Sequence, residues 1–114
     1  MKIINKTSNI TIAEKAVVAN SFLSRLVGLL NRRFLPKGEA LIITKCKSIH
    51  MFFMKFPIDA IFVDKNNHVV GIVKNIKPFQ LSPVFISSNY VIEAPVGTIV
   101  KARVAIGDNI ELQQ

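Results

Sequence analysis

The chain has 114 residues, half of them apolar, and a formal net charge of +8 that results from fifteen Lys and Arg against seven Asp and Glu. This length fits one domain with its own core, so we expect a single domain over residues 1–114. The lone cysteine, Cys46, excludes an intramolecular disulfide and a zinc cluster of paired cysteines. Residues 1–6 lack the apolar core of a signal peptide and no apolar run is long enough for a membrane helix, so we expect a cytoplasmic protein with no membrane span.

The first third of the chain predicts two strands followed by one helix. Met1–Lys6 and Glu14–Ala19 are the predicted strands. Asn20 or Ser21 can cap a helix, and apolar side chains then recur at helical spacing from Phe22 to Leu30. We therefore expect one amphipathic helix over about residues 20–31, packed on a sheet.

The rest of the chain has the pattern of short strands. The predicted strands are Ala40–Thr44, Ala60–Asp64, His68–Lys74, Tyr90–Ala94 and Ile110–Leu112. Lys65-Asn66-Asn67 predicts a hairpin turn, because Asn and Asp bond their own backbone and tolerate positive φ. Pro95 begins a short turn of helix or an irregular segment that continues through Val104. About seven short strands and one helix predict a mainly β, α+β fold, a small β-barrel or half-barrel with one packed helix.

The segment from Cys46 to Asp59 is the most unusual part of the chain. It places a thiol, a hydroxyl, an imidazole, an ammonium and a carboxylate among apolar residues, which is the composition of a binding pocket. A bend at Pro57 would gather these side chains into one recess. Each also has a structural alternative: Asp59 can cap backbone N–H groups, Cys46 can be buried and inert, and Glu93 can face solvent.

Catalytic and metal sites find little support in the sequence. Cys46 and His50 would meet on a helix, but on an extended segment they would lie about 13 Å apart. His50 and His68 lack the spacing of metal ligands, so no metal and no cofactor is expected. The five glycines are scattered and form neither a phosphate loop nor a nucleophile elbow. The sequence therefore leans against an enzyme.

Three motifs resemble those of a known family. The first motif is Ser24-Arg25-Leu26-Val27-Gly28-Leu29-Leu30. The second is Ser48-Ile49-His50-Met51-Phe52-Phe53-Met54-Lys55-Phe56-Pro57-Ile58-Asp59, and the third is Val91-Ile92-Glu93-Ala94-Pro95. This order is similar to that of the bacterial and archaeal family called domain of unknown function 192. The resemblance implies a compact, mostly β domain and no established activity. It also implies that His50, Met54, Lys55, Asp59 and Glu93 belong together, with Glu93 facing inward.

Three functions follow, the first being favoured. A binding module would take a small molecule or a protein segment in a pocket; its residues are Ser48, His50, Met54, Lys55, Asp59 and Glu93. A nucleic-acid accessory protein would bind RNA through the basic stretch of residues 25–55, whose face comprises Arg25, Arg32, Arg33, Lys37, Lys45 and Lys47. An enzyme that uses Cys46 or His50 is the least favoured. We expect a monomer or a weak dimer.

Overall fold

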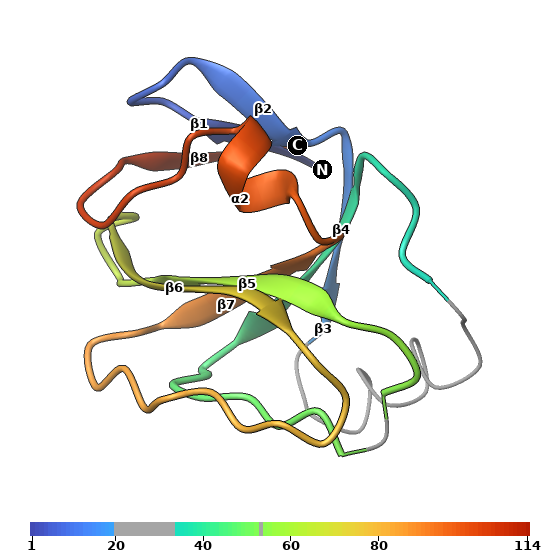
Figure 1. The fold of residues 1–114 in the computed structure, drawn as a ribbon. Coiled ribbons are helices and arrows are strands. Elements are labelled where there is room, and N and C mark those ends of the chain that lie inside the picture. Colours follow the sequence, from blue (N-terminus) through green and yellow to red (C-terminus); the bar gives the residue numbers. More distant parts are fainter. Residues whose placement is uncertain (20–33, 53) are drawn as a thin grey trace.

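A computed structural model describes residues 1–19, 34–52 and 54–114. The described residues form eight strands, a short helix and several ordered loops (Figure 1). The predicted helix over residues 20–31 lies outside the described residues.

The strands are arranged in two sheets. The smaller sheet has the order β2 (Ile10–Ala13), β1 (Lys2–Asn5), β8 (Ile110–Gln113), and all its pairs are antiparallel. The larger sheet has the order β3 (Lys15–Ala19), β4 (Glu39–Thr44), β7 (Tyr90–Ala94), β5 (Ile58–Val63), β6 (Val69–Ile76). Its pairs are antiparallel except for β3 and β4, which are parallel.

The mainly β, α+β prediction is confirmed, with one difference in architecture. The described strands lie in two sheets that do not close into a barrel. The strand Ile10–Ala13 was not predicted, although it has a clear cause: Asn9 takes the left-handed conformation at φ 58°, which turns the chain from β1 back along itself. The predicted hairpin is confirmed. Asp64 Oδ1 accepts hydrogen bonds from the backbone N–H groups of Asn66 and His68, and Asn67 has a φ of 66°.

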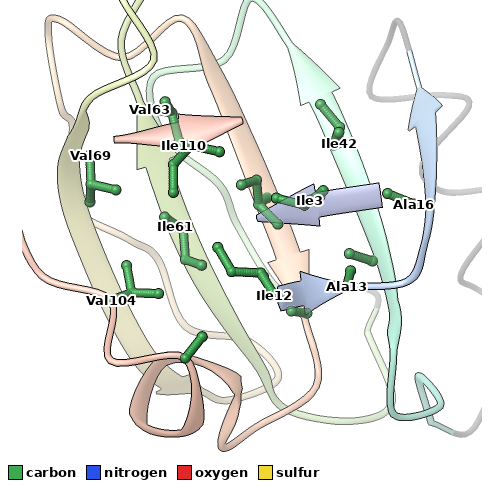
Figure 2. Close-up of a cluster of buried hydrophobic side chains, with 14 of the residues drawn as sticks. Ile3, Ile12, Ala13, Ala16, Ile42, Ile61, Val63, Val69, Val104 and Ile110 are labelled. Carbon is green, nitrogen blue, oxygen red and sulfur yellow. The ribbon is translucent and has the colours of Figure 1, made fainter. Parts of the chain in front are cut away.

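One hydrophobic cluster fills the space between the two sheets. Ile3, Ile12 and Ile110 of the smaller sheet pack towards Ile61 and Val63 of the larger sheet (Figure 2). The helix α2 (Thr98–Lys101) closes one end of this cluster through Ile99, which is 1% exposed. Figure 1 shows the smaller sheet and α2 together on one side of the larger sheet.

A second hydrophobic cluster covers the opposite face of the larger sheet. Successive side chains of a strand point to opposite faces, so Ile58, Ala60 and Phe62 of β5 contribute to this second cluster while Ile61 and Val63 contribute to the first. Two loops supply much of its cover: residues 45–52 and 54–57 form one, and residues 77–89 form the other (Figure 1). We call this side of the molecule the loop face.

Candidate functional site

Glu93 is a fully buried carboxylate in the middle strand of the larger sheet, with 0% exposure. Its neighbours across the sheet are Leu41 and Ala60, and both belong to the cluster under the loop face. Directly opposite residues point to the same face, so the Glu93 side chain also points to the loop side. The burial agrees with the inward orientation that the family resemblance implies. Burying a carboxylate costs free energy, so full burial of Glu93 is unusual for this residue type.

The loop that carries the central motif brings some of the predicted residues to the same side. Met54 is 6% exposed and packs in the second cluster, into which Glu93 also points. His50 is half-buried, and its ring stacks on Phe52 with centroids 4.9 Å apart. Ser48 and Lys55 are exposed. The structure therefore places Met54, His50 and Glu93 on the loop side, with Ser48 and Lys55 on its surface.

Asp59 has a different position. It pairs with Ala94, whose side chain belongs to the cluster between the sheets, so Asp59 points away from the loop face. Its Oδ1 accepts a hydrogen bond from Asn75 N at 2.8 Å, and its Oδ2 accepts from Gly97 N at 3.1 Å and Ile99 N at 3.0 Å. Asp59 thus accepts hydrogen bonds from backbone N–H groups, which is the structural alternative that the sequence offered for this residue.

Cys46, His50 and His68 have contacts of their own. Cys46 Sγ donates a hydrogen bond to the Ser48 carbonyl oxygen at 3.0 Å, and His50 forms a β-bridge with Leu81. The segment is thus not helical, and the helical contact that a thiolate–imidazole pair needs is not provided. His68 lies in the β5–β6 turn, bridged to Asn109. Within the described residues no group of three or more His, Cys, Asp or Glu is placed to hold a metal ion.

The basic face is only partly described. Arg25, Arg32 and Arg33 lie outside the described residues. Lys37 precedes β4, whereas Lys45 and Lys47 follow it, so that a strand of six residues, about 20 Å long, separates them.

Tyr90, at the start of β7, has a strongly perturbed hydroxyl. Its OH donates a hydrogen bond to Asn67 Oδ1 at 2.9 Å. Burial raises the pKa of the hydroxyl far above its usual value, and the nearby Asp64 carboxylate raises this pKa further. The group therefore stays neutral and ties β7 to the β5–β6 turn.

A cleft with a volume of about 520 Å³ lies in a place that the sequence did not indicate. Its wall on one side consists of all four residues of β2, continued by Glu14. The facing wall is the segment that leads into α2, namely Pro95 to Thr98, together with Lys101 and Ala102. Lys37 and Gly38 close one end. In Figure 2, α2 lies below the outer edge of β2, the edge that faces away from β1.

Asp59 is what holds the second wall of this cleft in place. Gly97 has a φ of 100°, a conformation that favours glycine, and it turns its N–H toward the Asp59 carboxylate. The Ile99 N–H binds the same oxygen. The end of the cleft is fixed in a similar way, because the Gly38 carbonyl oxygen accepts hydrogen bonds from Glu14 N and Lys15 N. Asp59 therefore fixes the position of this wall of the cleft.

The signal that could have revealed the cleft was weak. Thr7-Ser8-Asn9 followed by Ile10-Thr11-Ile12 is a polar turn before an alternating run of β-formers, which is the pattern of a short strand. Its facing wall comes from a segment more than eighty residues further along the chain, so no local motif joins the two walls.

Fold and cleft together define a small, mainly β α+β domain with two sheets and an open groove beside an edge strand. The chain belongs to the family called domain of unknown function 192, described as an uncharacterized ACR, whose sequence signature matches residues 3–112.

Relatives from several organisms agree with this membership. A UPF0127 protein of Pyrococcus abyssi is 34% identical over 115 residues, which cover 96% of this chain and 95% of that protein. A UPF0127 protein of Thermococcus kodakarensis is 35% identical over 112 residues, which cover 95% of this chain and 71% of that protein. The crystal structure of a protein of unknown function from Novosphingobium aromaticivorans has the same fold, with a TM-score of 0.83 at 22% identity over 98% of this chain and 84% of that one.

Proposed function

We propose that this protein is a binding module for an extended peptide segment, which pairs with the outer edge of β2 in the cleft. The proposal rests on one observation: all four residues of the edge strand β2 line a cleft of ligand-binding size.

The backbone of β2 supports strand addition. β2 pairs with β1 on one side, and no strand within the described residues pairs with its other side. An edge strand presents N–H and C=O groups that an extended peptide can bind, and this mode gives affinity without a preformed side-chain pocket. The facing wall adds the half-exposed side chain of Val96, which can contact alternate side chains of the added strand.

The charges at the cleft favour a peptide with an acidic side chain. Lys37 and Lys101 line the cleft and are exposed. The one acidic lining residue, Glu14, has its Oε2 at 3.8 Å from Lys2 Nζ, so its charge is partly balanced. The whole chain carries +8, which also speeds the approach of an acidic partner.

The binding-module class is thus the one that the sequence favoured, but the proposed place differs. A pocket around Ser48, His50, Met54, Lys55 and Glu93 stays a prediction, in which Asp59 has no direct part because it faces the other side of the sheet. RNA binding through Lys45 and Lys47 also stays a prediction.

The test uses a capped peptide of about six residues that alternates valine and threonine and ends in one aspartate. Added to the ¹⁵N-labelled protein, it should shift the backbone amide signals of Ile10–Ala13 and Thr98–Lys101. The double variant Lys37→Glu/Lys101→Glu should weaken binding by about tenfold, because it reverses both cleft charges. The matched control is Lys65→Glu/Lys77→Glu, which reverses two exposed lysines away from the cleft, changes the net charge equally, and should leave the affinity nearly unchanged.

Two results would reject the proposal. One is a set of shifted signals that leaves out β2. The other is an affinity that is the same for the aspartate peptide and for a version with lysine in its place, since the cleft lysines would then select nothing.

A further inference from the structure

The loop face exposes an unusual number of large apolar side chains. Phe79 is 73% exposed, Leu81 66%, Val84 65% and Ile86 80%, and all four lie in the loop of residues 77–89. Phe52, from the neighbouring loop, is 43% exposed. Apolar side chains that gather on one surface mark a site of contact with a partner or a membrane.

This apolar surface is held in place by the loop that faces it. The Phe79 N–H donates to the Met51 carbonyl oxygen at 2.8 Å and the Phe85 N–H to the Lys47 carbonyl oxygen at 2.8 Å. The Ser82 N–H donates to the Ile49 carbonyl oxygen, and the Ile49 N–H donates to the Ser82 hydroxyl oxygen. The two loops therefore form an irregular antiparallel ribbon, and the exposed side chains belong to a braced surface.

One aromatic side chain of the same loop shows the opposite orientation. The Phe85 ring lies against Phe62 of the larger sheet, with centroids 4.5 Å apart, and it fits only because residue 71 is a glycine. Phe79 keeps its outward side chain although its φ of 69° is unfavourable for an aromatic residue. The loop thus has one inward anchor and several outward apolar groups.

Both loops of the loop face carry lysines, and neither loop contains an acidic residue. Lys45, Lys47 and Lys55 lie on one loop, Lys77 begins the other, and all four are exposed. No Asp or Glu occurs between positions 40 and 58 or between positions 65 and 92. The loop face is therefore both apolar and positively charged.

We propose that the loop face docks on the surface of a bilayer that contains anionic phospholipid. Leu81, Val84 and Ile86, together with the two phenylalanines, enter the boundary between headgroups and acyl chains, while the lysines contact lipid phosphates. The proposed contact is with the bilayer surface. Within the described residues, no helix is long and apolar enough to cross a membrane. This surface is separate from the cleft, so the inference does not rest on the proposed function.

The chemistry of the exposed groups favours a lipid surface over nucleic acid. Proteins that bind single-stranded RNA combine a basic surface with aromatic rings that stack on the bases. Three of the most exposed apolar side chains here are aliphatic, and these have no stacking face for a base. They gain from an apolar medium, which a bilayer provides.

The experiment measures cosedimentation with vesicles of phosphatidylcholine alone and of phosphatidylcholine with about 30 mol% phosphatidylglycerol. We expect binding to the anionic vesicles only, weakened when salt is raised to about 0.5 M. Leu81→Ser/Ile86→Ser should lower the affinity at least about tenfold, because two inserted side chains lose their apolar character. The matched control is Val100→Ser/Ile106→Ser, which changes two side chains of similar exposure on the α2 side and should bind as the unmodified protein does.

A second pair of variants tests the charges. Lys77→Gln should lower the affinity roughly fivefold, whereas Lys65→Gln, away from the loop face, should not. Thermal unfolding confirms that each variant is folded.

Equal binding to both kinds of vesicle, no binding at low salt, or equal loss in the two serine variants would each overturn the proposal. So would binding of a single-stranded RNA probe, or of an acidic protein, in the absence of vesicle binding.

Discussion

The two faces of the larger sheet each hold a buried carboxylate, and the two are used differently. Asp59 on β5 and Glu93 on β7 lie on neighbouring strands, with exposures of 1% and 0%. Asp59 points between the sheets and binds three backbone N–H groups, which fixes the wall of the cleft. Glu93 points to the loop side, towards the apolar cluster of Met51, Met54 and Phe62. Burial alone therefore does not reveal the role of a carboxylate; the face and the groups that it binds do.

The two faces also differ in their cover. The cleft side is covered by a regular sheet and a helix, and its opening lies along a strand edge. The loop side is covered in part by two loops that turn apolar side chains outward. We infer that the first side takes a peptide and that the second contacts a membrane surface, so changes on one side should leave the other function intact.

The largest effect is expected from Asp59→Ala. The variant leaves the N–H groups of Asn75, Gly97 and Ile99 without their acceptor in a part-buried region, which should lower the free energy of unfolding by about 3–5 kcal/mol. Urea denaturation measures this loss. Asp59→Asn, which keeps one carbonyl oxygen, provides a milder variant in case the first does not fold.

Asp64→Ala is the matched control for Asp59. Its carboxylate also binds backbone N–H groups, of Asn66 and His68, but in an exposed turn where water can replace it. Asp64→Ala should therefore lower the free energy of unfolding by only about 1 kcal/mol. Equal losses at the two positions would contradict the special role of Asp59 in holding the cleft wall.

An intermediate effect is expected from Gly71→Ala, which tests how the loop face is anchored. A Cβ at this position would overlap the Phe85 ring, so the loop must shift, and the free energy of unfolding should fall by about 1–3 kcal/mol. Combining it with Phe85→Leu should cost less than the sum of the two single changes, because the smaller side chain relieves the overlap. Strict additivity in this double-mutant cycle would show that Phe85 does not anchor the loop over Gly71.

The smallest effect is expected from Tyr90→Phe, and it depends on pH. At neutral pH the variant should lose about 1 kcal/mol, the value of the hydrogen bond to Asn67. The folded protein raises the pKa of the Tyr90 hydroxyl above its unfolded value of 10.0, so its stabilisation is complete below pH 10 and is lost as the pH rises further. Denaturation of both proteins from neutral to alkaline pH should therefore show the stability gap narrowing above pH 10. A gap that stays constant would mean that the Tyr90 pKa is not raised.

Much of the fold could be predicted from the sequence because local chemistry determines it. The β5–β6 turn follows from Asp64 and Asn67, and the strand end at Ile76 follows from Lys77-Pro78. The parallel pairing of β3 with β4 and the separation into two sheets depend on contacts between distant segments, which no local pattern encodes.

The candidate site was less predictable for the same reason. Asp59 could be recognised as a possible cap, yet its three partners come from two segments that follow it by 16 to 40 positions. The cleft consists of ordinary residues, and only folding brings Thr11, Lys37 and Lys101 together. The segment of residues 46–59 is unusual in its composition, which can be recognised in the sequence. The cleft is lined by a strand of ordinary composition, whose distinctive feature is its position at the edge of a sheet.

The most direct test of peptide addition is hydrogen exchange of the β2 amides with and without saturating peptide. If the peptide pairs with the outer edge of β2, outward-facing N–H groups within Ile10–Ala13 should become protected, while β3, at the edge of the larger sheet, should be unchanged. Exchange in β2 that is the same in both states, or protection confined to residues 77–89, would contradict the account.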